Sequence, residues 1–377
     1  MTSQLRATLS VGYRPKIWRT EMIQVHVSKD DLRTVRAVDI PPSLLPTGAA
    51  RLQLKLFGLS ANNITYAAMG GSTLGYWDFF PGPPSWGCPP CWGFADVIES
   101  RVPSVAVGMR CYGYYPIAET LDVFPIDLDG SGFVDGATHR AKKAAIYNRY
   151  LLVSADPLYD SGFEREQVLF RPVFGAGWWL ADFVHRGNPQ TVVMSSATSK
   201  SALVTARQLR RLGDHRLVGL TSPKNTSYLR DIALYHQVLS YEDAASLATD
   251  GATTYVDFLG RESLTAKVHE VLGEHLICSV MFGATDWTDK PGGVQPPKGS
   301  VRGPTPEFFF TPSYREARLV EEPALSTAIQ RDMRDFYLSS RKFVTIHNMR
   351  GVDKIISCWM RLLSGDVSPS EGLALQF

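Results

Sequence analysis

The chain has 377 residues, of which 44% are hydrophobic and 20% are charged, and its formal net charge at pH 7 is +2. This composition is typical of a globular protein, and the length allows two domains with a cleft between them. Because acidic and basic residues are interspersed, no basic run indicates a nucleic acid or an anionic membrane as a partner.

The sequence also lacks signals of secretion and membrane insertion. It has no run of about eighteen apolar residues, and the N-terminus has no apolar core of signal-peptide length. The 5 cysteines argue against a disulfide scaffold in a chain of this length. We therefore expect a cytoplasmic protein that acts on a small molecule, with a homodimer as an open alternative to a monomer.

Strand patterns dominate the N-terminal half of the chain. Two occur within residues 20–40, and residues 51–57 alternate apolar and polar side chains as a half-buried antiparallel strand does. The stretch 75–93 is rich in aromatic residues, Pro and Gly, which predicts an irregular loop before a strand at 94–100. Two further strands are expected around the turn at Gly108.

The clearest signal lies in residues 190–227, which read as a strand, a tight loop, a helix and a second strand. The first strand is the β-branched run 191–194, and the helix stops at Gly213 before a strand at 216–222. In a doubly wound sheet such a loop places backbone N–H groups and the positive end of the helix dipole where a pyrophosphate can bind. Helix and strand patterns alternate after this unit, which is typical of a parallel sheet.

No glycine occupies this loop, although a dinucleotide-binding loop normally carries three. Its residues are nevertheless small enough for close approach, their hydroxyls can donate to phosphate oxygens, and a lysine adds positive charge where the helix starts. The cofactor-binding candidates here are Ser195, Ser196, Thr198, Ser199 and Lys200. A serine-rich N-cap of an ordinary buried strand–helix unit explains the same residues equally well.

The order of these pieces resembles the medium-chain dehydrogenase/reductase superfamily, particularly its zinc-free quinone and enoyl reductase branch. Residues 58–71 (GLSANNITYAAMGG) are similar to that branch's G-L-N-P-x-D-Y segment, residues 92–114 to its glycine–acidic–valine strand and turn, and residues 256–260 to its V-x-D-x-x-G strand. The resemblance covers roughly residues 20–365. A poorly characterised branch with a Ser-rich, glycine-poor cofactor loop is the closer match.

This resemblance implies an α/β fold class with two domains. A β-rich GroES-like catalytic domain is expected from residues 1–165 with 305–377, and a Rossmann-type doubly wound parallel sheet from residues 166–304. The resemblance also places Asn62 and Tyr66 at the substrate, where a Tyr hydroxyl can donate a proton or a hydrogen bond to a carbonyl oxygen as hydride arrives. Tyr66 as a packed aromatic residue is the alternative.

Ser222 and Lys224 follow the second strand, where the adenosine ribose of a cofactor lies in this fold. An acidic residue there favours a free 2′-hydroxyl, whereas Ser with Lys suits a 2′-phosphate, so the predicted cofactor is NADP. An ordinary turn of composition TSPKN is the alternative.

Other side chains are candidates for contact with substrate or metal. The substrate-binding candidates are Trp77, His139, Arg140 and Tyr147. The last three form a polar group that can bind an anionic substrate, although a solvated loop explains them too. Cys88 and Cys91 have zinc-ligand spacing, but no second pair follows, so we expect no metal site.

The sequence leaves three functions open. The first is an NADP-dependent reductase of a carbonyl or an activated carbon–carbon double bond. The second is a carbon–carbon lyase or hydrolase on a reductase scaffold that does not use nucleotide, and the third is a non-catalytic binding protein; the fold alone does not choose among them. For a reductase, we expect the pocket between the two domains, bounded by Tyr66, Trp77, the serine-rich loop and Ser222.

Overall fold

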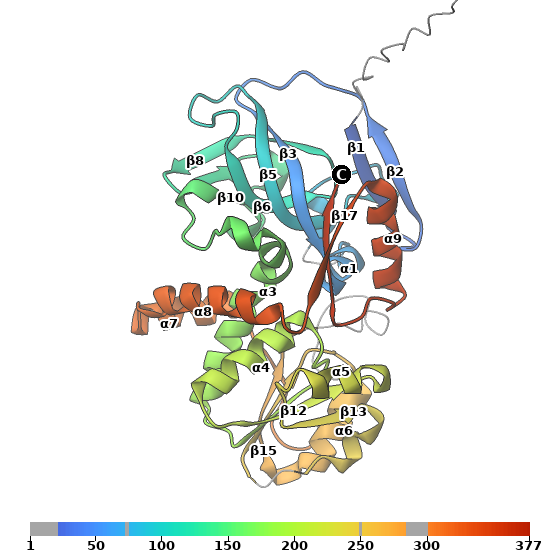
Figure 1. Ribbon diagram of the computed structural model, residues 1–377, viewed down its shortest axis with the longest axis vertical. Helices are drawn as coiled ribbons and strands as arrows, with labels where there is room; N and C mark the ends of the chain where they lie inside the picture. The colour runs from blue at the N-terminus through green and yellow to red at the C-terminus, as the bar shows by residue number, and fades with distance from the viewer. Residues whose placement is uncertain (1–21, 72–74, 249–250, 284–300) are drawn as a thin grey trace, which may run out of the picture.

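The computed structural model describes residues 22–71, 75–248, 251–283 and 301–377. Figure 1 shows a β-rich domain above a parallel sheet that is flanked by helices, with helix α3 (Glu164–Arg186) between the two. Within the described ranges, no helix combines the length and the apolarity that a membrane span requires.

The β-rich domain is built around a nine-stranded sheet whose strands come from residues 50–152 and 345–376. Its strands are β3 (Ala50–Leu59), β5 (Pro90–Ser100), β6 (Arg110–Pro116), β7 (Thr120–Val123), β8 (Pro125–Asp129), β9 (Gly132–Asp135), β10 (Arg149–Leu152), β17 (Thr345–Arg350) and β18 (Glu371–Gln376). They follow the order β17-β18-β3-β5-β6-β10-β9-β8, and β7 pairs with β3 off this path. The last strand, β18, is antiparallel to β3 and parallel to β17, so the end of the chain completes the sheet.

Smaller elements cover this sheet. A second sheet pairs β1 (Met22–Ser28) with β2 (Val35–Ile40) and β4 (Trp86–Gly87), and the α-helices of this domain are α1 (Ala61–Ala68), α2 (Ala145–Asn148) and α9 (Val352–Leu363). Short 3₁₀ helices connect elements throughout the described chain at Tyr76–Asp78, Thr138–Arg140, Val153–Ala155, Ser161–Phe163, Pro223–Asn225, Glu242–Ser246 and Gly273–His275.

The second domain is a six-stranded sheet with the order β13-β12-β11-β14-β15-β16. Its strands are β11 (Thr191–Met194), β12 (Arg216–Thr221), β13 (Gln237–Ser240), β14 (Thr253–Asp257), β15 (Leu276–Met281) and β16 (Glu307–Phe308), and its helices are α4 (Lys200–Leu212), α5 (Thr226–Asp231) and α6 (Glu262–Leu272). All five strand pairs are parallel, and the chain runs outward from β11 in both directions. This is the doubly wound order, which brings the ends of β11, β12 and β14 to one edge. The predicted α/β fold class with two such domains is confirmed.

Helix α3 contacts both domains, with β3, β5 and β18 on one side and α4 on the other. Its first turn carries Glu164 and Glu166 and its last turn carries His185 and Arg186, which complement the helix dipole at both ends. Helices α7 (Thr311–Glu321) and α8 (Leu325–Ser340) pack against it and project to one side in Figure 1.

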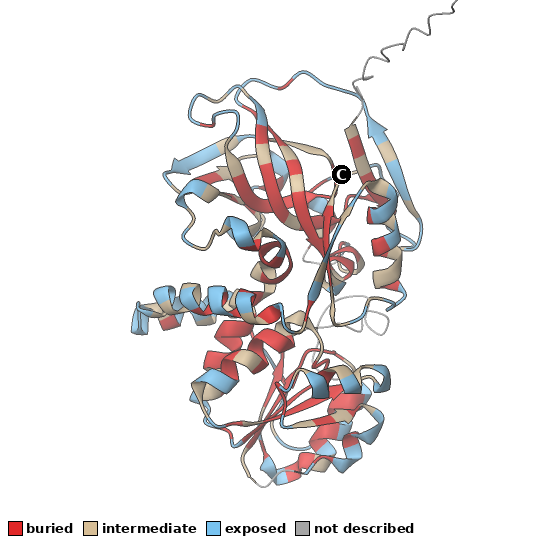
Figure 2. Cartoon of the chain, in the orientation of Figure 1, coloured by how far each residue is buried: buried red, intermediate tan, exposed pale blue. Residues whose placement is uncertain are grey.

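One apolar core runs from the β-rich domain through α3 into the parallel sheet. It contains Leu56 of β3, Phe94 of β5, Trp178 of α3 and Met194 of β11, all of which are buried. Figure 2 shows this buried region on the strands of both domains and on α3 between them. Because the core spans the junction, apolar burial stabilises the relative placement of the two domains.

Gly58 of β3 lies directly against α3. A Cβ atom at this position would come within 2.4 Å of the Val168 carbonyl oxygen and 2.8 Å of the carbonyl carbon. Both atoms belong to the backbone of a packed helix, which cannot move aside as a flexible side chain can. The strand and the helix therefore pack at a distance that only glycine permits, just before the chain enters α1.

Replacing Gly58 with alanine should lower the free energy of unfolding by about 1–3 kcal/mol, because the added methyl group forces the strand and the helix apart. The control is Gly175→Ala in α3, where an added Cβ atom meets nothing within 4 Å. Helix propensity should make that variant about 0.5–1 kcal/mol more stable than the wild type. Denaturant unfolding measures both changes, and a Gly58→Ala protein as stable as the wild type would contradict the packing account.

Candidate active site

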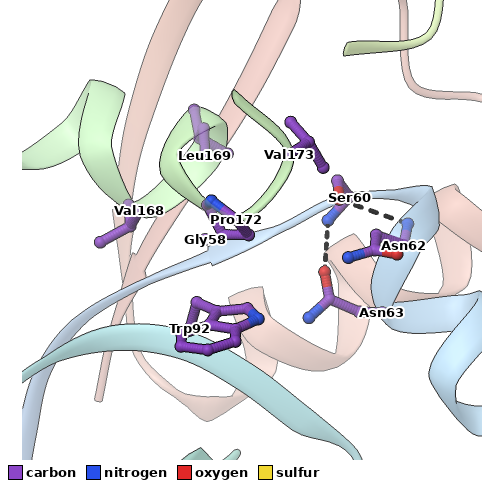
Figure 3. Close-up of a pocket in the computed structure, with 9 residues that line it drawn as sticks. All are labelled: Gly58, Ser60, Asn62, Asn63, Trp92, Val168, Leu169, Pro172 and Val173. Atoms are coloured by element: carbon purple, nitrogen blue, oxygen red, sulfur yellow. Dashed lines mark hydrogen bonds between the residues drawn. The ribbon is translucent and has the colours of Figure 1, made fainter. Parts of the chain in front are cut away.

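Helix α1 carries the two residues that the sequence analysis places at the substrate. Its N-terminus is fixed by the Ser60 hydroxyl, which accepts from the Asn62 amide at 3.3 Å, and by the Ser60 amide, which donates to the Asn63 side-chain oxygen at 2.8 Å (Figure 3). The Asn63 side chain also donates to the Pro90 carbonyl at 2.9 Å, which ties α1 to β5. Because Asn62 and Tyr66 are four residues apart, they lie on one face of the helix.

The Tyr66 hydroxyl accepts two hydrogen bonds. The Asn62 side-chain nitrogen donates to it at 2.8 Å, and the Trp92 indole nitrogen donates to it at 3.3 Å. Both bonds use the hydroxyl oxygen, so among the described contacts its own proton stays available for a ligand. Burial raises the pKa of Tyr66, and the two donated hydrogen bonds oppose this rise only in part. The hydroxyl is therefore protonated at neutral pH and suited to donate.

A small cavity borders Asn62 and Trp92 where β3, α1, β5 and α3 meet. Its lining residues, shown in Figure 3, are Gly58, Ser60, Asn62, Asn63, Trp92, Val168, Leu169, Pro172 and Val173. The volume is about 10 Å³, which is room for one water molecule. A substrate needs more space than these residues enclose.

Tyr66 belongs to a cluster of six ring side chains, and we name this group the aromatic box: Tyr66, Tyr76, Phe79, Trp92, Tyr114 and Tyr147. The ring centroids lie 4.7 Å apart for Tyr66 and Tyr76, 4.9 Å for Tyr114 and Tyr147, and 5.9 Å for Trp92 and Tyr147. The Tyr76 and Tyr147 hydroxyl oxygens are 3.4 Å apart. The structure thus brings Asn62, Tyr66 and Tyr147 together from the predicted set. It adds Tyr76 and Trp92. The stretch 75–93 is rich in aromatic residues, but this pattern does not show which of the rings turn inward.

Trp77 and His139, two predicted substrate residues, lie elsewhere. Trp77 is 7% exposed and belongs to the core of the β-rich domain. A Cβ atom on Gly70 or Gly87 would approach its ring to 2.3 and 2.2 Å, so the ring fills the space that two glycines leave. His139 is exposed, and a nitrogen of its ring lies 3.1 Å from the Phe79 carbonyl at a separate groove. Packing rather than substrate contact accounts for Trp77.

Arg140 is buried in a network inside the β-rich domain and is 1% exposed. Its guanidinium donates to Asp135 at 2.9 Å, to Asn148 at 3.0 Å and to the Tyr150 hydroxyl at 3.0 Å. It also donates to the Tyr147 main-chain oxygen. With four of its five N–H donors bonded inside the domain, the buried side chain holds the segment that carries Tyr147, which corrects the role expected from the sequence.

Ser195 holds strand ends together instead of facing a phosphate. Its hydroxyl donates to Asp257 Oδ1 at 2.6 Å and accepts from the amides of Phe258 at 2.9 Å and Leu259 at 3.0 Å. With one donated and two accepted bonds, the hydroxyl is saturated. The side chain therefore joins the end of β11 to the end of β14, which corrects the prediction that it binds the cofactor.

The rest of the serine-rich loop keeps a shape that suits an anion. Ser196 adopts a left-handed backbone with φ 44°, a conformation that glycine normally supplies. Ser199 is the N-cap of α4, and its hydroxyl accepts from the Ala202 amide at 3.3 Å. Among the described main-chain hydrogen bonds, none uses the amides of Thr198 and Lys200 as donors. These amides lie at the positive end of the α4 dipole, as a pyrophosphate requires.

Two glycines outside the loop allow the packing that loop glycines usually provide. On α3, a Cβ atom at Gly177 would lie 3.0 Å from the Val204 side chain of α4, so the two helices pack closely at this glycine. On β12, a Cβ atom at Gly219 would lie 3.0 Å from that of Ala197. The close helix and strand approaches of a nucleotide-binding unit are thus present although its loop has no glycine.

Lys200 reaches from the start of α4 across the domain junction. Its ammonium group donates to the Glu371 main-chain oxygen, at the start of β18, at 3.3 Å. Burial lowers the pKa of Lys200 to about 8, and the negative charge of Glu371 opposes this only in part. A phosphate beside Lys200 would restore the preference for the charged form.

Ser222 and Lys224 follow β12, as the sequence analysis expects. The Lys224 ammonium donates to the Gly365 main-chain oxygen, just beyond α9, at 2.9 Å. Nearby, the Tyr228 hydroxyl donates to the Phe343 carbonyl at 3.0 Å. Like Lys200, Lys224 and Tyr228 join the parallel-sheet domain to the C-terminal segment. The Lys224 ammonium group has three N–H donors and uses one of them here, so a phosphate can bind beside the main-chain oxygen.

The residues of this junction fit an anionic dinucleotide. The helix-terminal amides and Lys200 suit the pyrophosphate. The Thr221 hydroxyl, at the end of β12, is buried and has no hydrogen-bond partner among the described atoms, which leaves a polar group where a ribose lies in this fold. The residues that the structure describes contain no cluster of three His, Cys, Asp or Glu side chains that could hold a metal ion.

Comparison with solved structures defines the class of fold. CurA from Vibrio vulnificus in complex with NADPH is 13% identical, with a TM-score of 0.61 and coverage of 94% of this chain and 98% of that one. A putative NADPH:quinone reductase from Mesorhizobium loti is 11% identical (TM-score 0.58, coverage 95% and 99%), and a thermostable alcohol dehydrogenase from Pyrobaculum aerophilum is 14% identical (TM-score 0.55, coverage 95% and 100%). The chain therefore has the medium-chain dehydrogenase/reductase fold, with a GroES-like and a Rossmann domain, as the order of its sequence segments predicts.

Within this fold class, the chain belongs to a family described as "Protein of unknown function (DUF2855)", whose model matches residues 57–368. The matched range includes α1, the aromatic box and the serine-rich loop. No curated protein matches the chain.

Replacing Arg140 with leucine should lower the free energy of unfolding by about 3–5 kcal/mol, because it leaves the buried Asp135 carboxylate without its cation. Its neighbour His139 is exposed, so His139→Ala should change stability by no more than about 0.5 kcal/mol. Denaturant unfolding of the two variants compares the residues directly. An Arg140→Leu variant as stable as the wild type would contradict this structural role and would favour the substrate contact predicted from the sequence.

Proposed function

We propose that the protein is an NADP-dependent oxidoreductase that reduces a carbonyl group or an activated carbon–carbon double bond of a small molecule in the cytoplasm. The observation that carries this proposal is the Tyr66 hydroxyl, which accepts from Asn62 and Trp92 and keeps its own proton for a ligand. A protonated phenol in this state can donate a hydrogen bond or a proton to an oxygen that gains negative charge during reduction.

The remaining roles follow from the fold and the loop. The amides of Thr198 and Lys200, with the Lys200 ammonium group, bind the pyrophosphate, and Ser222 with Lys224 binds the 2′-phosphate. The bound cofactor supplies the hydride, while Asn62 and Trp92 orient the Tyr66 hydroxyl. The CurA structure, which has this fold, is a complex with NADPH, and this supports the choice of cofactor. The proposed reaction is independent of zinc, because the cofactor supplies the hydride and the Tyr66 hydroxyl serves the substrate oxygen.

A carbon–carbon lyase or hydrolase that uses no nucleotide is the second candidate. One observation favours it: Lys200 and Lys224, the two cations meant for phosphates, both donate to main-chain oxygens of the C-terminal segment. In that case these contacts would be permanent ties between the domains.

A turnover assay tests the proposal. The purified protein is mixed with NADPH and 4-phenylbut-3-en-2-one, which offers both a carbonyl and an activated double bond, and the loss of NADPH absorbance is followed. The proposal predicts NADPH consumption with formation of a reduced product in equal amount. Product formation without NADPH consumption would favour the second candidate.

Replacing Tyr66 with phenylalanine should lower kcat about 10²- to 10⁴-fold, the range expected when a general acid is lost. The matched control is Tyr114→Phe in the same aromatic box, because the Tyr114 hydroxyl is buried without a hydrogen-bond partner among the described atoms. Steady-state kinetics should show the loss for Tyr66→Phe only. A wild-type kcat for Tyr66→Phe would remove Tyr66 from the reaction.

Replacing Lys224 with alanine should weaken NADPH binding about ten- to a hundredfold, because a charge-assisted hydrogen bond contributes about 1.5–3 kcal/mol. NADH lacks the 2′-phosphate, so its affinity should hardly change. Dissociation constants for both cofactors, measured from nicotinamide fluorescence, give the comparison. Equal losses of NADPH and NADH affinity would mean that Lys224 only ties the domains together.

At a pH above the pKa of Lys200, the protein should take up a proton when it binds NADPH. Burial lowers the pKa of Lys200 to about 8, so the free protein holds Lys200 mostly neutral above that pH. A nearby pyrophosphate favours the ammonium form and raises this pKa, so binding adds a proton. Well below pH 8, Lys200 is charged in both states and uptake should vanish.

Titration calorimetry in buffers of different ionisation enthalpy counts these protons. Lys200→Arg is the control, because its guanidinium is charged at every pH used and cannot take up a proton. Uptake that persists in Lys200→Arg would show that another group titrates.

A further inference from the structure

The aromatic box has an open edge and a closed base. Tyr76, Trp92 and Tyr147 are half-buried, whereas Tyr66, Phe79 and Tyr114 are buried. The open edge therefore presents large rings that are only partly covered by the protein. Partly exposed rings can bind flat apolar groups, since offset and edge-to-face ring contacts contribute beyond the area that they bury.

Every hydrogen-bonding group described in the box is electrically neutral. The Asn62 amide and the Trp92 indole both donate to Tyr66. The Tyr76 and Tyr147 hydroxyls lie 3.4 Å apart, and burial raises the pKa of both, so they remain phenols at neutral pH. The box can therefore share hydrogen bonds with uncharged oxygen atoms, but it offers no formal positive charge.

Two described cations lie over a ring of the box, and each is paired with a carboxylate. Arg140 binds Asp135 at 2.9 Å, and its guanidinium carbon lies 5.9 Å from the Phe79 ring. Lys143, whose ammonium nitrogen is 5.4 Å from the same ring, binds Asp78 at 2.8 Å. These pairs cancel the positive charge that an anionic ligand would seek.

The third cation lies behind Trp92. Arg171 binds Asp156 at 2.5 Å, and its guanidinium carbon is 4.2 Å from the centre of the Tyr112 ring. Tyr112 in turn stacks on Trp92, with ring centroids 5.7 Å apart. A ring thus separates this ion pair from the box, and both of its side chains are nearly buried.

We infer that the site takes an uncharged aromatic carbonyl compound and discriminates against the same compound carrying a carboxylate. The carbonyl group in this statement rests on the proposed reductase function, since it is the group that Tyr66 would serve. The selection for rings and against charge rests on the box itself. A carboxylate placed there would lose hydration without gaining a cation, and that loss is costly.

A pair of probes that differ only in one carboxylate tests the selection. The neutral probe is 4-phenylbut-3-en-2-one, and the anionic probe carries a carboxylate on the ring carbon opposite the side chain. Binding of each to the wild-type protein without cofactor is followed by quenching of tryptophan fluorescence. The neutral probe should bind at least tenfold more tightly, and equal or tighter binding of the anionic probe would overturn the inference.

Two tryptophan variants show where the probe binds. Trp92→Phe should lose part of the quenching by the neutral probe, because Trp92 is a wall of the box. Trp86→Phe is the control, since that ring stacks under Arg36 at 3.8 Å in another part of the β-rich domain, and its quenching should match the wild type. Unchanged quenching in Trp92→Phe would place the probe outside the box and overturn the inference.

Turnover with NADPH separates this inference from the function on which it rests. If the neutral probe binds the box and NADPH is not consumed, the reductase proposal fails while the selection for uncharged aromatic ligands stands. If both probes are reduced with equal kcat/KM, the selection fails while the reductase proposal stands.

Discussion

The packing of α3 between the two sheets is the constraint on which the rest of the structure depends. Gly58 lets β3 approach the Val168 carbonyl of this helix, and Gly177, further along the helix, lets α4 approach it. A single apolar core, from Phe94 through Trp178 to Met194, follows the helix from one domain to the other. This one helix thus positions the segment that leads into α1 and the segment that leads into α4.

This arrangement divides the chemistry between the domains. The β-rich domain supplies a phenol whose oxygen accepts two hydrogen bonds, which leaves its proton available for a ligand among the described contacts. The parallel sheet supplies helix-terminal amides and Lys200, which favour negative charge. Contacts of Lys200 and Lys224 with main-chain oxygens of the C-terminal segment join the two parts. The same side chains are thus available both to close the junction and to meet a phosphate.

Local patterns allowed much of the fold and part of the candidate site to be predicted from the sequence. The β-branched run at 191–194 and the small residues after it predict β11 and the loop, because both follow from neighbouring residues. The resemblance of residues 58–71 likewise places Asn62 and Tyr66 at one site, and the structure shows that the two side chains are hydrogen-bonded.

Contacts between distant segments could not be predicted in this way. Ser195 is saturated by Asp257 and the amides after it, 62 to 64 residues away in the chain. Lys200 meets an oxygen 171 residues further on, and no local pattern reports such a partner. Arg140 was misassigned for a related reason, since its polarity suggests a ligand whereas its burial becomes visible only when the strands around it are in place. Burial and pairing of polar side chains are properties of the fold.

The central claim is that the junction between the two domains binds a phosphorylated nicotinamide cofactor. Titrating NADPH into the purified protein and following the nicotinamide fluorescence tests it most directly. The account predicts saturable binding of one NADPH per chain with a dissociation constant in the micromolar range, which corresponds to about −8 kcal/mol. Absence of saturation at millimolar NADPH would contradict it.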